Sequence, residues 1–264
     1  MIKDGIIKEE RLRSFLMIGQ SNMAGRGEFG EVPPIENDKC FMLRMGRWQQ
    51  MKEPVNPDRP IFEGIYHSGI SLAASFADEM AKDSGEEIGL IPCADGGTYI
   101  SQWQPGEVLF DHAVTMTRLA LRSSDFGGII WHQGESDCIN YNEDEYRRMF
   151  LNTMTSLRRE LDAENLPLII GELSENITSQ HGLGDNVRKM NILLHELQQE
   201  LPLCGIVSAE GLPLKPDGIH FSSKACREFG IRYFEKYKDS ELYFEGKVGT
   251  GFGAGGCTSC RIYP

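Results

Sequence analysis

The chain has 264 residues, of which 40% are hydrophobic and 25% charged, and its formal net charge is −12. These values are typical of a soluble globular protein with a full hydrophobic core. Nucleic acid is excluded as an expected partner, because phosphate binding needs a basic patch and the chain has no cluster of Lys and Arg. No apolar run approaches the roughly 20 residues of a membrane span, so we expect no membrane association.

The compartment and the cofactors are constrained by the N-terminus and the cysteines. Residues 1–5 are too polar for a secretory signal, and seven irregularly spaced cysteines are typical of reduced thiols. We therefore expect a cytoplasmic protein. Cys257 and Cys260 lack the second pair that a zinc site requires, and the chain has no phosphate loop or dinucleotide fingerprint. We expect no metal and no cofactor; the oligomeric state stays open.

Apolar runs alternate with amphipathic segments along the chain. The runs predict five buried strands, at residues 14–20, 88–94, 126–131, 166–171 and 204–208. The amphipathic segments predict helices at residues 68–82, 108–121, 142–162, 185–201 and 222–237. Continuously apolar strands separated by helices imply a parallel sheet covered on both faces. With right-handed crossovers this is an α/β fold, a doubly wound three-layer α/β/α sandwich.

Two segments show no clear periodicity of hydrophobic residues. Residues 25–66 contain Gly, Pro and Met and are long for a loop, so we expect them to be functional or partly structured. Residues 240–264 are rich in glycine, and we expect a flexible extension beyond a single domain at residues 1–239.

Polar residues directly follow several of the predicted strands. Ser21 follows the first strand, Asp95–Thr98 the second and Gln133–Glu135 the third. Since ligands bind at the carboxyl ends of parallel strands, these residues are expected to share one site. A serine presented at such an end is a candidate nucleophile, although an ordinary strand-to-loop junction gives the same pattern.

A second stretch supplies a candidate base for this serine. Asp217 precedes His220 by three residues in a turn rich in Pro and Gly, so its carboxylate can bind one ring nitrogen while the other acts as a base. Alternatively, Asp217 caps the next helix and His220 is incidental. The chain order Ser, Asp, His at one sheet edge favours the catalytic interpretation.

Acyl transfer also needs donors that stabilise an oxyanion. The candidates are the backbone N–H of Ser21, the backbone of Gly97 and the side-chain amide of Gln133. The alternatives are a plain turn glycine for Gly97 and strand-end hydrogen bonding for Gln133.

Glu135 and two aromatic residues complete the candidate site. Glu135 orients His220, binds backbone near Ser21, or simply closes a turn. Because a buried carboxylate must be paired, we expect His220 or a backbone donor close to it. Tyr66 and Trp103 lie in loops and suit the faces of sugar rings, the alternative being loop packing.

Four blocks together resemble the SGNH-hydrolase superfamily. They are Gly-Gln-Ser-Asn-Met-Ala-Gly at 19–25, Gly-Gly-Thr at 96–98, Trp-His-Gln-Gly-Glu-Ser-Asp at 131–137 and Asp-Gly-Ile-His-Phe at 217–221. Within the superfamily they are similar to the sialate O-acetylesterase-like domain of carbohydrate esterase family 6, over about residues 12–238. The resemblance implies a flavodoxin-like fold with a five-stranded parallel sheet and serine esterase chemistry without a cofactor.

The resemblance also implies a role for each matching residue. Ser21 is the nucleophile, His220 the base and Asp217 its partner, while Gly97 and Gln133 join the Ser21 amide in the oxyanion hole. Gln133 stands where typical SGNH enzymes have Asn, as in this branch of the superfamily. The branch is also described with the Glu of its His-Gln-Gly-Glu block as a contributing acid, which here is Glu135.

The substrate implied by the resemblance is an acetylated carbohydrate. Acetylated xylan or xylo-oligosaccharides are the first expectation, and O-acetyl sialic acid is the second because an acidic chain disfavours an anionic substrate. Further alternatives are a general short-chain acyl esterase, a transacylase and a non-catalytic carbohydrate-binding relative. The last would lack a triad residue, whereas Ser21, Asp217 and His220 are all present.

Overall fold

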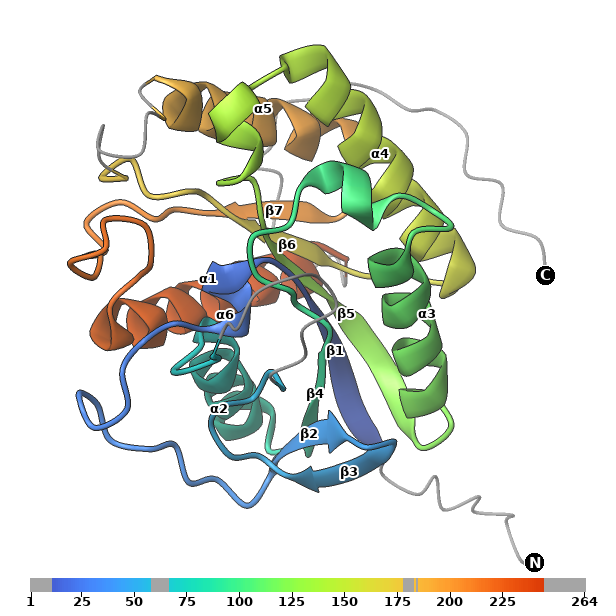
Figure 1. Cartoon of the computed structure of the whole chain (residues 1–264). Coiled ribbons are helices and arrows are strands. Elements are labelled where there is room, and N and C mark those ends of the chain that lie inside the picture. The colour runs from blue at the N-terminus through green and yellow to red at the C-terminus, as the bar shows by residue number, and fades with distance from the viewer. Residues whose placement is uncertain (1–10, 58–66, 178–182, 184, 245–264) are drawn as a thin grey trace, which may run out of the picture.

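Seven strands form one sheet in the order β3-β2-β4-β1-β5-β6-β7 (Figure 1). The computed structural model describes residues 11–57, 67–177, 183 and 185–244. All neighbouring strands are parallel except β2 and β3, which form an antiparallel pair. The strands are β1 (Leu12–Gly19), β2 (Cys40–Arg44), β3 (Arg47–Gln50), β4 (Ile88–Pro92), β5 (Ser124–His132), β6 (Leu168–Gly171) and β7 (Cys204–Val207).

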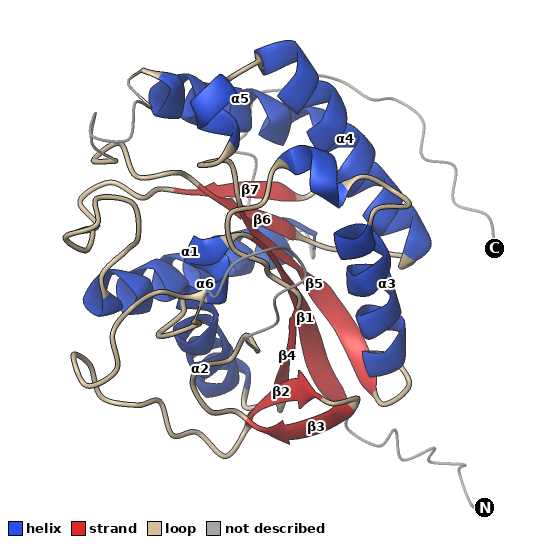
Figure 2. Ribbon diagram, in the orientation of Figure 1, coloured by secondary structure: helices blue, strands red, loops and turns tan. Residues whose placement is uncertain are grey.

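Helices cover both faces of the sheet, as Figure 2 shows. One face carries α2 (Leu72–Ser84) and α6 (Ser223–Phe244). The other carries α3 (Val108–Ala120), α4 (Glu143–Glu160) and α5 (Asn186–Glu200). Because successive side chains of a strand point to opposite faces of the sheet, the central strands contribute residues to both cores. In β1, for example, Phe15 faces the first core and Leu16 the second. The expected three-layer α/β/α sandwich is confirmed.

The number of strands differs from the expected five. The additional strands, β2 and β3, lie within the segment that shows no clear period and are joined by a tight turn at Met45 and Gly46, both with positive φ. These strands have five and four residues, and β3 is mostly exposed, so it has no apolar run to detect. The hairpin extends the sheet beyond β4, where the Trp48 ring lies against Gly89.

Most helix boundaries lie within two residues of those expected, with two exceptions. Helix α2 begins at Leu72 rather than at residue 68, because Ser71 is its N-cap and accepts from the N–H of Ala73. Helix α6 continues to Phe244, so the first five residues of the predicted extension are helical. Residues 245–264 lie outside the described part of the chain. Within that part, no helix combines the length and apolar character needed to cross a membrane.

The backbone conformation at the end of β1 determines the position of Ser21. Gly19 has φ +133°, and a Cβ at this position would lie 2.1 Å from the carbonyl oxygen of His132 at the end of β5. Only glycine allows this close approach. The next N–H, that of Gln20, donates to the same carbonyl at 2.9 Å, and the chain then enters the short helix α1 (Ser21–Ala24). The carboxyl ends of β1 and β5 are thereby joined directly behind Ser21.

Candidate active site

Ser21, His220 and Asp217 form one hydrogen-bonded chain. Ser21 Oγ lies 2.9 Å from Nε2 of His220, and Nδ1 of the same ring lies 2.9 Å from Oδ2 of Asp217. Ser21 begins α1, whereas the other two residues lie between β7 and α6, 199 residues away for His220. With Nδ1–H donated to the carboxylate, Nε2 is the acceptor for the serine proton.

Asp217 is held in its ionised form by its surroundings. Burial by itself raises the pKa of this carboxyl, but the backbone N–H groups of His220 and Ile219 and the His220 ring outweigh it and hold the pKa below its usual value. Both N–H groups donate to Oδ1, at 2.9 and 3.0 Å. An ionised carboxylate bound to an imidazole favours the imidazolium form of the ring, so this arrangement is suited to a general base.

Asn22 joins the serine and histidine segments, a role that the residue patterns had not suggested. Its Nδ2 donates to Glu135 Oε1 at 2.6 Å and to the carbonyl of Ile219 at 3.3 Å, while its Oδ1 accepts from the N–H of Phe221 at 3.1 Å. The residue after Ser21 therefore binds both chain neighbours of His220. Its place in the Gly-Gln-Ser-Asn block is the one signal in the sequence that marks it.

Glu135 does not contact His220, contrary to one of the three interpretations. Its Oε1 accepts from Asn22 and lies 3.1 Å from Nε2 of the fully buried His132. Burial raises the pKa of Glu135, but the His132 ring and the Asn22 amide outweigh it and hold the pKa below its usual value. Of the two partners expected for this carboxylate, the backbone donor is present, since a backbone N–H also lowers the pKa of Glu135, whereas His220 is replaced by Asn22 and His132, which both bind Oε1.

A cavity of about 260 Å³ opens at Ser21 and His220. Its lining is polar around the serine and apolar at Ile139, Leu183 and Ile219. The remaining lining residues are Gln20, Arg26, Gly96, Gly97, Glu135 and Ser136. This volume matches a small ligand better than a polymer in full contact with the protein.

Two residues that line this cavity have a backbone N–H without an acceptor. Within the described residues, the N–H groups of Ser21 and Gly97 donate to no protein group. Gly97 has φ +72°, a conformation that favours glycine, and no atom lies within 4 Å of the position of a Cβ there. Both donors are free for a substrate oxygen.

The side chain of Gln133 is not in the cavity, contrary to the expectation that it supplies an oxyanion donor. It is fully buried, and its Nε2 donates to the carbonyl of Thr98 at 2.9 Å and to Oδ2 of Asp137. Its Oε1 accepts from the Tyr146 hydroxyl at 3.1 Å. Every polar group of the amide is therefore used inside the protein, and it supports the turn that carries Gly97.

Trp103 is also in a different place from that expected. Its side chain is fully buried, packs edge-on against Trp131 with ring centroids 5.4 Å apart, and donates from Nε1 to Thr98 Oγ1 at 3.2 Å. It packs behind the Gly97 turn and is closed to substrate. The other aromatic candidate, Tyr66, lies outside the described residues.

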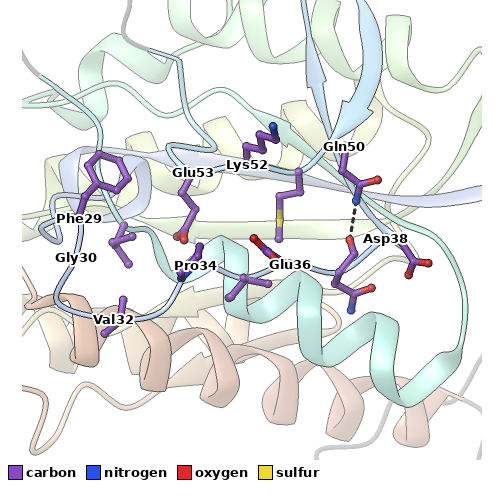
Figure 3. Close-up of a pocket in the computed structure, with 13 residues that line it drawn as sticks. Phe29, Gly30, Val32, Pro34, Glu36, Asp38, Gln50, Lys52 and Glu53 are labelled. Carbon is purple, nitrogen blue, oxygen red and sulfur yellow. Dashed lines mark hydrogen bonds between the residues drawn. The ribbon is translucent and has the colours of Figure 1, made fainter.

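A second and larger cavity, of about 870 Å³, lies between residues 29–38 and residues 50–53 (Figure 3). Figure 3 shows Phe29, Val32 and Pro34 along one wall and Lys52 and Glu53 along the other. No member of the triad lines it. Across the described ranges, no group of three or more His, Cys, Asp or Glu side chains is arranged to hold a metal ion.

Comparison with known proteins agrees with the resemblance carried by the four blocks. The profile of the family described as carbohydrate esterase, sialic acid-specific acetylesterase matches residues 11–239. The chain is 31% identical over 244 residues to a probable carbohydrate esterase of Arabidopsis thaliana, covering 84% of this chain and 89% of that one.

Solved structures of other proteins also resemble this chain. A crystal structure of an Arabidopsis thaliana protein superposes with a TM-score of 0.76 at 26% identity, covering 87% of this chain and 98% of that one. NanS superposes with a TM-score of 0.69 at 17% identity, covering 90% and 98% of the two chains, and supports the fold. The chain therefore belongs to the carbohydrate esterase, sialic acid-specific acetylesterase family, and by that membership it is a carbohydrate O-acetylesterase.

Proposed function

We propose that the protein removes O-acetyl groups from sugars through an acetyl-serine intermediate on Ser21. The observation that carries this proposal is the chain of hydrogen bonds from Ser21 through His220 to Asp217 beside the small cavity. A serine hydroxyl is a weak nucleophile until a neighbouring base takes its proton, and this arrangement supplies that base.

In the acylation step, Nε2 of His220 takes the Ser21 proton while Oγ attacks the acetyl carbonyl carbon. The N–H groups of Ser21 and Gly97 stabilise the negative charge that develops on the carbonyl oxygen. The tetrahedral intermediate then breaks its bond to the sugar oxygen, which takes the proton from His220 and leaves as an alcohol. In the second step His220 removes a proton from water, and the resulting hydroxide attacks the acetyl-serine. The acyl bond to Ser21 then breaks, His220 returns its proton to Oγ, and acetic acid leaves and ionises in solution.

The first substrate candidate is acetylated xylan or its oligosaccharides, which the block pattern implies and the neutral charge of these sugars favours. A cavity of about 260 Å³ fits one acetylated sugar unit with the rest of the chain outside it. O-acetyl sialic acid is the second candidate, because the guanidinium of Arg26 lines the same cavity and is a partner for a carboxylate.

Replacing the nucleophile tests the chemistry. Ser21→Ala is expected to lose almost all hydrolysis of nitrophenyl acetate, because no other group in the triad can form the acyl intermediate. Ser84→Ala, at the end of α2, serves as a matched control and is expected to keep wild-type activity. Ser21→Ala protein that hydrolysed the ester at the wild-type rate would exclude the acetyl-serine mechanism.

Acetate release from three substrates tests the specificity. Acetyl-xylo-oligosaccharides, acetylated monosaccharides and O-acetyl sialic acid are compared side by side with the wild-type enzyme. The highest kcat/KM is expected for the xylo-oligosaccharides; a higher value for the sialic acid would select the second candidate. Acetyl transfer to added sugar acceptors instead of water would identify a transacylase.

A further inference from the structure

We propose that the cavity of about 870 Å³ between residues 29–38 and residues 50–53, the groove, is a second carbohydrate site. It binds the uncharged sugar units that follow the acetylated one in an oligosaccharide. This inference rests on the proposed deacetylation of sugars and names where the rest of such a substrate lies. It follows from the position of the groove beside the active-site cavity, from the chemistry of its lining and from its charge.

The groove begins beside the active-site cavity. Arg26 lines the active-site cavity and Phe29 lines the groove, and three residues of extended chain span at most about 11 Å. Between them, Gly27 pairs with Ile70, which also lines the groove. The N–H of each residue in this pair donates to the carbonyl of the other, at 3.1 and 2.9 Å. The same short stretch of chain therefore borders both cavities.

Lys215 joins this border to the segment that carries His220. Its Nζ donates to the carbonyl of Arg26 at 2.8 Å and binds the carboxylate of Glu28. Its backbone N–H donates to the carbonyl of His220 at 2.7 Å. The border between the two cavities is therefore held in place relative to His220, so one substrate molecule can contact both cavities at once.

The lining of the groove suits the two kinds of surface that a sugar chain presents. Figure 3 shows Phe29 at one end and Asp38 at the other, with Val32 and Pro34 between them. Phe29 is 56% exposed, so its ring is open to the C–H face of a sugar. Within the described residues, the backbone N–H groups of Val32 and Lys52 donate to no protein group and are open to sugar hydroxyls.

The size of the groove suits several sugar units. Met51 and Ile70 are almost fully buried and still line the groove, so they form an apolar base. Its volume of about 870 Å³ lies in the range of about 300–1,000 Å³ that is typical of ligand sites. The active-site cavity, of about 260 Å³, accommodates one acetylated unit, and the groove accommodates the units next to it.

The charges of the groove favour an uncharged chain over an anionic one. Glu36 and Asp38 are exposed acids that line it, and Lys52 is an exposed base. Glu53 is paired with Arg227, so its charge is neutralised. Two exposed carboxylates against one ammonium repel an anionic polysaccharide. A chain of neutral sugars, such as the xylose units of xylan, meets no such repulsion.

The first test measures how KM depends on the length of the substrate. Acetate release by the wild-type enzyme is followed on acetylated xylose and on singly acetylated xylo-oligosaccharides of increasing length. KM is expected to fall with length until the groove is filled, with kcat nearly constant, because the distant units bind equally in the ground state and in the transition state. A KM that did not change with length would overturn the inference.

The second test removes the exposed ring. Phe29→Ala is expected to raise KM for the longer xylo-oligosaccharides about fivefold, with kcat unchanged, and the effect is expected to disappear as the substrate is shortened to acetylated xylose. Ile192→Ala on α5 is the matched control, since Ile192 is 53% exposed and lines neither cavity. Wild-type KM for the longer substrates in Phe29→Ala would contradict the inference.

A second variant covers the case in which Phe29→Ala does not fold. Lys52→Ala, on the opposite wall of the groove, removes an exposed donor for sugar hydroxyls, and a rise in KM confined to the longer substrates is expected. Wild-type KM for those substrates in Lys52→Ala would then overturn the inference.

Acetylated oligogalacturonides, whose units carry carboxylates, test the argument from charge. KM is expected to fall less with length for these anionic chains than for the xylo-oligosaccharides. A larger fall for the anionic chains would show that the groove binds an anionic polysaccharide and would overturn the proposal.

Failure of this inference is distinguishable from failure of the proposed function. A wild-type enzyme inactive on nitrophenyl acetate and on every acetylated sugar would refute the proposed function. An enzyme that hydrolyses O-acetyl sialic acid alone, or acetylated xylose with a KM independent of chain length, would refute only the role of the groove.

Discussion

Asp217 and Glu135, the two carboxylates considered as the acid of the triad, differ in their partners. Asp217 accepts from His220 and two backbone N–H groups at the protein surface, whereas Glu135 is buried between Asn22 and His132. Asp217 is therefore placed to stabilise charge on the base. Glu135 instead holds Asn22, which binds the segments on either side of His220.

Neutral isosteres of these two acids are expected to behave differently. Asp217→Asn removes the ionised partner of the His220 ring and is expected to lower kcat by about 10³–10⁴-fold with little loss of stability, as for other triads. Glu135→Gln keeps an acceptor for one neighbour but places an amide N–H against buried groups, so it is expected to lower the free energy of unfolding by about 1–3 kcal/mol.

Steady-state kinetics with nitrophenyl acetate and urea unfolding of both variants provide the measurement. A larger loss of kcat in Glu135→Gln than in Asp217→Asn would identify Glu135 as the orienting acid and contradict the assignment.

At the scale of elements, the short helix α1 depends on α2 for its position. The Ser71 hydroxyl donates to the carbonyl of Met23 at 2.8 Å and accepts from the N–H of Ala73 at 3.1 Å. One side chain therefore caps α2 and anchors the end of α1, two residues after Ser21. The cap of α4, Asn142, accepts from Glu145 at 3.2 Å but is not among the residues around the cavity.

These two caps form a matched pair of substitutions. Asn142→Ala is expected to lower the free energy of unfolding by about 1 kcal/mol and to leave kcat unchanged. Ser71→Ala is expected to lower it by about 2–3 kcal/mol, because the buried carbonyl of Met23 also loses its donor, and to lower kcat as well. Urea unfolding measures the stability of the two variants, and acetate release measures their kcat. Equal kcat in the two variants would show that α2 does not position α1.

At the scale of the whole molecule, the site lies at the carboxyl edge of the sheet, and the half-buried acid Asp137 lies behind it. Asp137 accepts from Gln133 and from the N–H of Ile100 at 3.1 Å. Burial raises its pKa from 3.8 to about 6, with Glu135 adding to the effect and the two donors opposing it. Cys138 and Tyr146, whose own pKa values are raised by burial, are its other titratable neighbours.

This acid predicts a pH dependence of stability. Between about pH 4 and pH 6 the folded protein holds a proton on Asp137 that the unfolded chain has lost, so the free energy of unfolding falls as pH rises through this window. Asp137→Asn lacks this contribution. The difference in unfolding free energy, wild type minus variant, is expected to shrink by about 2–3 kcal/mol from pH 4 to pH 7.

Urea unfolding at several pH values measures this difference. A difference that stayed constant with pH would show that Asp137 has the same pKa in the folded and unfolded chains.

The hydrophobic pattern of the sequence was sufficient to predict the class of the sheet. The short sequence blocks were sufficient to predict the candidates for the triad. Ser21 follows a buried strand, and Asp217 and His220 sit three residues apart, so their meeting at one sheet edge follows from strand order and turn geometry. The hairpin of β2 and β3 was missed, because strands of five and four residues at a sheet edge carry too few buried positions to show a period.

Side-chain directions were decided only by the tertiary structure. The sequence shows two glutamines near the nucleophile, and backbone groups far along the chain determine where each amide points: Gly134 and Ser136 for Gln20, Thr98 for Gln133. Burial of Trp103 and the pairing of Glu135 likewise depend on neighbours brought in by other strands and helices. A hydrogen bond needs its partner within about 3 Å, and sequence spacing alone cannot specify that distance across separate elements.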